Sequence, residues 1–158
     1  MSSQPVPAGS TTVGLFGQPN SGKSTLFNAL TGLRQHIANY PGVTVEKKTG
    51  RLDRHGHRIE LVDLPGTYNL SAFSPEERVV SQFLIQERPQ AVINVLDATQ
   101  LRRGLMLTLQ LLEMGLPLIA VLNMSDVAER NRQPVNTERL SAALGVPVVS
   151  TVGRRGHG

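Results

Sequence analysis

Apolar positions along the chain form short runs that alternate with segments of helical periodicity. The runs are rich in Val, Ile and Leu and are bounded by Gly, Pro or charged residues, a pattern typical of strands buried on both faces. The segments between them carry apolar residues at spacings of three and four, as a helix with one buried face requires. These patterns predict strands at 13–16, 44–54, 58–64, 91–96, 116–122 and 146–149, and helices at 22–33, 75–87, 101–114 and 137–144.

The order of these elements predicts the fold class. Alternating strands and helices are typical of an α/β fold, here a mostly parallel six-stranded sheet with one antiparallel edge strand and helices on both faces. Residues 54–57, Arg-His-Gly-His, separate two strands and predict the hairpin that supplies the antiparallel edge. Thr137 precedes the last predicted helix and is its expected N-cap. In open sheets of this kind, ligands bind at the carboxyl ends of the strands.

Length and composition predict one folded domain. The chain has 158 residues; residues 1–11 are rich in Ser, Pro and Gly and predict a flexible leader, and residues 12–158 predict the domain. There is no cysteine, which excludes disulfides and suits a reducing cytoplasm. No apolar run reaches the ~18–20 residues of a membrane helix, so we expect the chain itself to be soluble.

The charge raises the question of an anionic partner such as RNA. The formal net charge is +4 and the isoelectric point is about 10.1. However, the basic residues are scattered, and the aromatic side chains (two Tyr and four Phe) provide no platform for stacking bases. We therefore expect no nucleic-acid partner.

Residues 17–24 match the pattern GxxxxGK[ST] between a predicted strand and a predicted helix. Its glycines let backbone N–H groups turn toward phosphate oxygens at the positive end of the helix. We expect Lys23 to reach the β- and γ-phosphates and the Ser24 hydroxyl to bind Mg²⁺. The residues predicted to bind nucleotide in this P-loop are Gly17, Gln18, Pro19, Asn20, Ser21, Gly22, Lys23, Ser24 and Thr25.

Asp63 ends an apolar run and opens the turn Asp63-Leu64-Pro65-Gly66. A carboxylate at a strand end can hold Mg²⁺ through its water shell, and Gly66 can bring its backbone N–H to a γ-phosphate. Such a turn is common on its own. One hairpin after a P-loop, it predicts that all four residues contact the nucleotide.

Thr44 lies between the first helix and the second strand, where a threonine can close on Mg²⁺ and the γ-phosphate of GTP and release them after hydrolysis. We expect Gly42, Val43 and Thr44 to form this part of the site; Thr49 is the other candidate, but it lies inside the predicted strand. The predicted catalytic residues are Lys23, Thr44 and Gly66, and the predicted Mg²⁺ ligands are Ser24, Thr44 and Asp63.

Asn123-Met124-Ser125-Asp126 follows a predicted buried strand. A carboxylate at Asp126 can accept hydrogen bonds from N1–H and the exocyclic amine of guanine, a pair of donors that adenine lacks. Met124 stands where a lysine is usual, and its thioether can cover the face of the base. We predict base contacts by Asn123, Met124 and Asp126, and hence a P-loop GTPase with a Ras-like fold.

Residues 17–32, 39–48 and 63–71 resemble the G domain of the bacterial ferrous-iron transport protein B (FeoB) family. The strings Pro-Gly-Val-Thr-Val-Glu and Leu-Pro-Gly-Thr-Tyr within them are far more specific than the P-loop. The resemblance implies a GTPase domain on the cytoplasmic face of the bacterial inner membrane that gates Fe²⁺ uptake through a membrane portion of the same protein. It also places the last base-contacting loop on Val152, Gly153 and Arg154, with Ser150 and Thr151 as a rival frame.

Related G domains cover one sheet face with a helix that follows this last loop, and here the sequence ends before it. We therefore expect an uncovered apolar patch, and hence lower stability or self-association.

Ras-like enzymes place a glutamine after the Asp-x-x-Gly turn to orient the attacking water, and Thr67 stands there in this chain. We therefore expect slow hydrolysis, with Glu76 or Glu77 either positioning water or serving only as acids of a first helical turn. Resemblance to K⁺-dependent GTPases implies that Asn20 is the ligand of a K⁺ ion; the other interpretation is that Asn20 only hydrogen-bonds its own loop.

Two other functions remain open for this sequence. The high isoelectric point favours an RNA-binding GTPase of ribosome or tRNA maturation, and a nucleotide sensor would bind GTP without turning it over.

Overall fold

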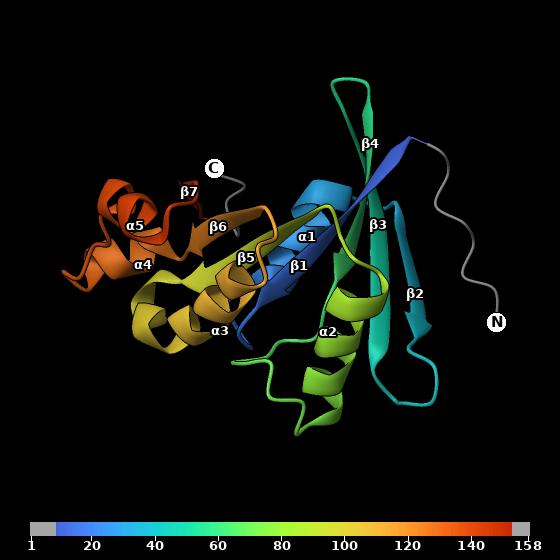
Figure 1. Cartoon of the computed structure of the whole chain (residues 1–158). Helices are drawn as coiled ribbons and strands as arrows, with labels where there is room; N and C mark the ends of the chain where they lie inside the picture. The colour runs from blue at the N-terminus through green and yellow to red at the C-terminus, as the bar shows by residue number, and fades with distance from the viewer. Residues whose placement is uncertain (1–8, 153–158) are drawn as a thin grey trace.

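The computed structural model of the chain describes residues 9–152. Strands and helices alternate along most of this range (Figure 1). The strands are β1 (Ser10–Gly17), β2 (Gln35–Asn39), β3 (Glu46–Arg54), β4 (His57–Asp63), β5 (Ala91–Asp97), β6 (Leu118–Asn123) and β7 (Val148–Ser150). The helices are α1 (Lys23–Thr31), α2 (Pro75–Gln86), the 3₁₀ turn η1 (Ala98–Gln100), α3 (Leu101–Glu113), α4 (Ser125–Arg130) and α5 (Thr137–Leu144).

The strands of the described range form one sheet in the order β2-β3-β4-β1-β5-β6-β7. β4, β1, β5, β6 and β7 pair in parallel, and β3 pairs antiparallel with both of its neighbours. The α/β fold with helices on both faces is confirmed. The sheet itself corrects the prediction, because it has seven strands and its antiparallel strand, β3, lies second from the edge.

β2 is the strand that the apolar pattern does not reveal. Its residues are polar or small except Ile37, which is 55% exposed. It forms because its backbone pairs with β3, from Gln35 opposite Gly50 to Asn39 opposite Glu46. Pairing at a sheet edge satisfies backbone groups without burying side chains, so the sequence carries no hydrophobic signal for it.

Several other boundaries differ from the predicted ones. The side-chain oxygen of Asn136 accepts the N–H of Arg139 at 2.9 Å, so Asn136 is the N-cap of α5 and Thr137 is its first residue. β3 begins at Glu46 and not at residue 44, and β1 begins at Ser10, inside the predicted leader. α4 is too short for a helical repeat to appear in the sequence. Residues 1–8 of the leader lie outside the described range.

Two apolar clusters pack on the two faces of the sheet. On one face, α1 places Phe27 against Leu15 and Val95. On the other face, α2 and α3 cover a cluster in which the rings of Phe16 and Phe83 lie 6.1 Å apart. Every one of these side chains is at most 3% exposed. Within residues 9–152, no helix is long and apolar enough to cross a membrane.

Candidate nucleotide-binding site

Most of the predicted site residues lie at the carboxyl ends of parallel strands. The P-loop follows β1, the turn of residues 63–66 begins at the end of β4, and the loop of residues 123–126 begins at the end of β6. β1 lies between β4 and β5, so the chain leaves β1 where the strand order reverses. Open α/β sheets bind their ligands at such a point.

The P-loop turns from β1 into α1 through two residues in the left-handed region, Asn20 (φ 62°) and Gly22 (φ 87°). A Cβ on Gly22 would approach the side-chain nitrogen of Asn123 to 2.0 Å, besides being strained by that φ. Only glycine fits this position. The turn ends at the N-terminus of α1, where orphan N–H groups and the helix dipole favour an anion.

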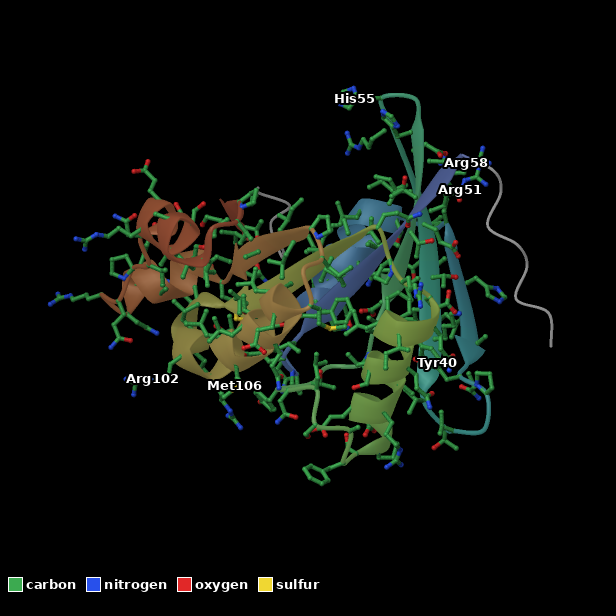
Figure 2. The ribbon with its side chains drawn as sticks, in the orientation of Figure 1. Tyr40, Arg51, His55, Arg58, Arg102 and Met106 are labelled. Atoms are coloured by element: carbon green, nitrogen blue, oxygen red, sulfur yellow. The ribbon has the colours of Figure 1, made fainter. Side chains whose placement is uncertain are left out.

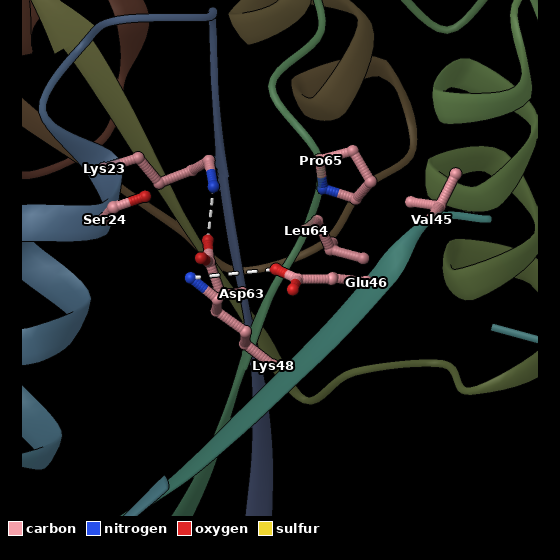
Figure 3. A pocket seen from close by; sticks show the side chains of 8 residues that line it. All are labelled: Lys23, Ser24, Val45, Glu46, Lys48, Asp63, Leu64 and Pro65. Atoms are coloured by element: carbon pink, nitrogen blue, oxygen red, sulfur yellow. Dashed lines mark hydrogen bonds and ion pairs between the residues drawn. The ribbon is translucent and has the colours of Figure 1, made fainter. Parts of the chain in front are cut away.

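Lys23 and Asp63 form a buried ion pair between α1 and the end of β4, with side chains only 10% and 6% exposed. They lie in a cavity of about 230 Å³ (Figure 3), less than the ~300–1,000 Å³ that drug-sized ligands occupy. This end of the site therefore has room for a phosphate group and an ion. The cavity is lined by Lys23, Ser24, Val45, Glu46, Lys48, Asp63, Leu64 and Pro65.

The donors in this cavity suit a magnesium ion. The Ser24 hydroxyl and the Asp63 carboxylate are hard oxygen donors that come from two different elements. The Lys23 ammonium compensates the Asp63 carboxylate, which would otherwise be a buried, unpaired charge. With ligands bound, Lys23 would pair with a phosphate and Asp63 with a cation, so each buried charge would keep a partner of opposite sign. The residues present therefore fit Mg²⁺ bound together with a phosphate.

The turn of residues 63–66 lies directly on the P-loop. Thr67 donates its N–H to the carbonyl oxygen of Gly17 at 3.0 Å, and a Cβ on Gly66 would approach Cα of Pro19 to 2.9 Å. Thr67, in the place of the Ras-like glutamine, is only 4% exposed. A buried threonine is poorly placed to orient a solvent water; slow hydrolysis itself stays a prediction.

Glu77 has a structural role at the N-terminus of α2. Its carboxylate accepts hydrogen bonds from the Ser71 hydroxyl at 2.6 Å and the Phe73 N–H at 2.9 Å, while the Ser74 hydroxyl accepts the Glu77 N–H at 3.1 Å. The Ser71 hydroxyl, followed by the Phe73 N–H, lowers the pKa of Glu77 because both stabilise the charged form. This capping box favours the interpretation of Glu77 as a first-turn acid. Glu76, in the same turn, is exposed.

Thr44 does not line the cavity in this conformation. Between β2 and β3 the chain makes a tight turn in which the Tyr40 N–H donates to the carbonyl oxygen of Val45 at 2.9 Å. Gly42 and Thr44 are exposed there and Val43 is half-buried, whereas Val45 belongs to the cavity wall. The structure thus brings Ser24 and Asp63 together without Thr44.

Tyr40 holds this turn against α2, a role that the sequence does not reveal. Its ring packs against the core cluster beneath α2 (Figure 2), and Lys47 Nζ lies 5.7 Å from the ring centroid. Lys47 also lies 3.8 Å from the carboxylate of Glu87 at the end of α2. Burial, with smaller effects from the negative charges of Glu87 and Asp63, raises the pKa of Tyr40. The hydroxyl therefore stays protonated, and the ring serves as an anchor.

At the opposite end of the site, Asn123 joins the loop after β6 to the P-loop. Its side-chain nitrogen donates to the carbonyl oxygen of Ser21 at 3.0 Å, and its side-chain oxygen accepts from the Thr151 hydroxyl at 3.2 Å. Asn123 is 5% exposed. Asp126, by contrast, accepts from an Arg130 guanidinium nitrogen at 3.3 Å and keeps a side chain that is 20% exposed. A base can therefore reach Asp126, while Asn123 holds the two loops together.

The last predicted loop is only partly within the described residues. Val152 ends the described range, and Gly153 and Arg154 lie outside it. The residues of the rival frame both contact the loop after β6, since Ser150 Oγ lies 2.6 Å from Ser125 Oγ and Thr151 contacts Asn123.

A family model described as ferrous iron transport protein B matches residues 11–158. The chain belongs to this family. An Fe(2+) transport protein A/FeoB fusion protein of Porphyromonas gingivalis is 53% identical over 148 residues, which cover 92% of this chain and 17% of the relative. The Fe(2+) transporter FeoB of Escherichia coli K12 is 48% identical over 151 residues, which cover 93% and 20%. The chain thus spans about a fifth of the length of these FeoB relatives.

Solved FeoB structures have the same fold. The cytosolic domain of L. pneumophila FeoB superposes with a TM-score of 0.90 at 44% identity, covering 94% of this chain and 65% of that one. The G domain of the T. maritima FeoB iron transporter gives 0.87 at 41% identity, covering 94% and 91%. A mutant of S. thermophilus NFeoB bound to mGDP gives 0.87 at 45% identity, covering 92% and 56%. Both the FeoB resemblance and the P-loop GTPase fold are confirmed, and the chain is the G domain of a FeoB protein.

Proposed function

We propose that this FeoB G domain binds GTP and GDP with Mg²⁺ and hydrolyses GTP slowly, so that its two nucleotide states act as a switch. The observation that carries the proposal is the 3.0 Å hydrogen bond from Asn123 to the Ser21 carbonyl oxygen. It holds the loop of Asp126 in a fixed relation to the P-loop, as recognition of base and phosphates by one ligand requires. Two S. thermophilus FeoB structures were solved with GDP bound, which supports a guanine nucleotide as the ligand here.

The residues divide between the nucleotide's phosphates and the metal. Lys23 would exchange its partner Asp63 for the β- and γ-phosphates, and the Gly66 N–H would contact the γ-phosphate. Ser24 and Asp63 would hold Mg²⁺. When bound, Mg²⁺ neutralises charge on the phosphate oxygens during transfer. The P-loop and the turn of residues 63–66 would contribute backbone N–H donors. The positions of these donors need not change as the reaction proceeds.

Thr44 would join the site only in the GTP state. Its turn is held by the Tyr40–Val45 hydrogen bond and by β2, an edge strand with a single neighbour. Because most β2 side chains are exposed, peeling β2 from β3 would expose little further apolar surface. Closure of Thr44 on Mg²⁺ and the γ-phosphate, and its release after hydrolysis, would make this turn the moving part of the switch.

Asn20 would bind K⁺ through its side-chain carbonyl oxygen. The side chain is exposed on the P-loop, and within residues 9–152 it makes no hydrogen bond to the loop. This speaks against the interpretation of Asn20 as a loop-holding residue only. A monovalent cation there would supply positive charge where the leaving oxygen becomes negative.

In the complete protein, the G domain would lie on the cytoplasmic face of the bacterial inner membrane and regulate Fe²⁺ uptake through the membrane portion. This is supported by relatives described as Fe(2+) transporters and by a solved relative described as a cytosolic domain. The family match favours this role over an RNA-binding GTPase, for which only the isoelectric point speaks.

Titration calorimetry with GTP, GDP and ATP in Mg²⁺ tests the proposal directly. We expect wild type to bind both guanine nucleotides and not ATP, and to release phosphate from GTP slowly. Lys23→Ala should weaken binding of both guanine nucleotides by at least about tenfold, because a charge-assisted hydrogen bond to phosphate is lost. Undiminished binding by Lys23→Ala, or equal affinity of wild type for ATP, would refute the assignment.

A further inference from the structure

Two adjacent lysines of β3 lie on opposite faces of the sheet. Lys47 faces α2, where it contacts the Tyr40 ring and Glu87. Lys48 faces the P-loop side and lines the same cavity as Lys23 and Ser24 (Figure 3). The alternation of side chains along a strand accounts for this separation. Of the two charges, only that of Lys48 is directed to the phosphate end of the site.

The pairing of β3 with β4 fixes where Lys48 lies. Its Cα is the direct partner of the Asp63 Cα across the two strands, so the two side chains project from the same face. The Lys48 side chain is 32% exposed, and its Nζ lies 4.0 Å from a carboxylate oxygen of Glu46, whose side chain is 62% exposed. Among the described residues, Lys48 is therefore a cation at the rim of the cavity whose one ion pair is weak and partly solvent-exposed.

The charges of the cavity indicate when Lys48 would change partner. Lys23 is paired with Asp63 and Lys48 with Glu46, so the four groups balance one another. GTP brings one more phosphoryl group, and more negative charge, to the Asp63 end of the site than GDP does. A lysine is a compact charge on a flexible stem, and it can exchange an exposed carboxylate for a phosphate without moving the strand.

We propose that Lys48 binds the γ-phosphate of GTP and so discriminates GTP from GDP, and that Glu46 holds the ammonium group when no γ-phosphate is present. This inference rests on the proposed guanine-nucleotide site. It adds a cation from β3 to the phosphate contacts of the P-loop.

The test compares affinities for GDP and for a non-hydrolysable GTP analogue in Mg²⁺, by titration calorimetry. We expect Lys48→Met to weaken analogue binding about tenfold, the lower end for a charge-assisted hydrogen bond at a partly exposed group, while GDP affinity stays within about twofold. Lys48→Arg should retain most of the preference because it keeps the charge. Lys47→Met is the matched control: it removes the same charge from the same strand on the other face, and should change neither affinity.

A second variant is expected to gain affinity, which a folding defect would not produce. Glu46→Gln leaves Lys48 without its carboxylate partner and should strengthen analogue binding by about twofold, with GDP unchanged; melting curves check that each variant folds. The inference would be overturned if Lys48→Met lowered the affinities for GDP and the analogue equally, or lowered neither. It would also be overturned if Lys47→Met had the same effect as Lys48→Met. If wild type binds neither guanine nucleotide, the proposed function fails instead.

Discussion

The carboxylate that we propose reads the base lies at the start of α4. The Asp126 side chain is 20% exposed and pairs with the Arg130 guanidinium at 3.3 Å, a weak surface contact. Its oxygens therefore remain available as acceptors for N1–H and the exocyclic amine of guanine. Asn123, which belongs to the same predicted motif, is instead buried between the two loops. The residue of the motif proposed to read the base, Asp126, is thus a different one from Asn123, which holds the loop.

Asp126→Asn should exchange guanine selectivity for xanthine selectivity. The new amide presents a donor to guanine N1–H, so GTP affinity should fall on the order of 10²-fold or more. Xanthine carries a carbonyl oxygen in place of the amine, so affinity for xanthosine triphosphate should rise. Competition binding with both nucleotides measures the exchange. Glu129→Gln, an exposed neighbour on the same helix, is the control; an Asp126→Asn protein that keeps wild-type GTP affinity would contradict the assignment.

Asn20 makes the hydrolysis rate depend on the monovalent cation, if it holds K⁺ as proposed. Phosphate release by wild type should be faster in KCl than in NaCl, by less than the ~10³–10⁵-fold that an arginine finger supplies. Asn20→Ala should abolish the difference between the two salts. Equal rates of the wild type in the two salts, or K⁺ stimulation retained by Asn20→Ala, would exclude the K⁺ site.

At the scale of elements, the segment before α2 is ordered by its helix cap. The Glu77 carboxylate binds the Ser71 hydroxyl and the backbone N–H groups of Phe73 and Ser74. These contacts close the segment between the turn of residues 63–66 and α2 onto the first turn of the helix. The stability of this segment therefore depends on the ionisation of the half-buried Glu77 carboxylate.

Glu77→Gln should make the domain less sensitive to acid. The pKa of Glu77 is lowered from 4.5 in the folded protein, so its contribution to stability is fully present above about pH 4.5 and is lost as the pH falls through the lowered value. Wild type should therefore lose stability on acidification more steeply than Glu77→Gln, whose side chain does not titrate. Thermal melts from pH 6 to pH 3 measure this, with Glu76→Gln as the control; parallel curves for wild type and Glu77→Gln would refute it.

At the scale of the molecule, the α1 face of the sheet is covered unevenly. α1 packs over the cluster of Leu15, Phe27 and Val95. Farther along the same face, Ile119 lies opposite Ile93, and Val149 lies opposite Val121. Ile119 and Val149 are 40% and 41% exposed. Exposed apolar side chains thus lie on the neighbouring strands β6 and β7.

The 158-residue chain should therefore self-associate at high concentration. Ile119→Thr combined with Val149→Thr should lower the apparent mass in concentration-dependent light scattering, because both keep strand-forming side chains and remove apolar surface. Ile85→Thr is the control, since Ile85 is 65% exposed on α2, on the other face. A wild-type chain that stays monomeric at every concentration would contradict the prediction.

The sequence by itself determined the order of most elements and the identity of the predicted phosphate and base loops. Gly22, Lys23 and Asp63 stand out because their roles are tied to local chemistry: a left-handed turn, an ammonium at a helix start and a carboxylate at a strand end. Buried strands and amphipathic helices can also be recognised in the sequence, because a repeating burial pattern requires a repeating apolar pattern. Such features depend on neighbours along the chain.

Only the tertiary structure decided features that depend on residues far apart in the sequence. β2 exists because β3 offers it a backbone partner, and with β2 in place the turn of Thr44 stays outside the cavity. Asn123 holds the P-loop because β6 and β1 end at the same edge of the sheet. The sequence does not show which of Lys47 and Lys48 faces the site. The register of β3 against β4 places Lys47 on the α2 side of the sheet and Lys48 at the cavity of Lys23 and Asp63. Register is set by long-range backbone pairing, in which a shift of one residue reverses every side chain.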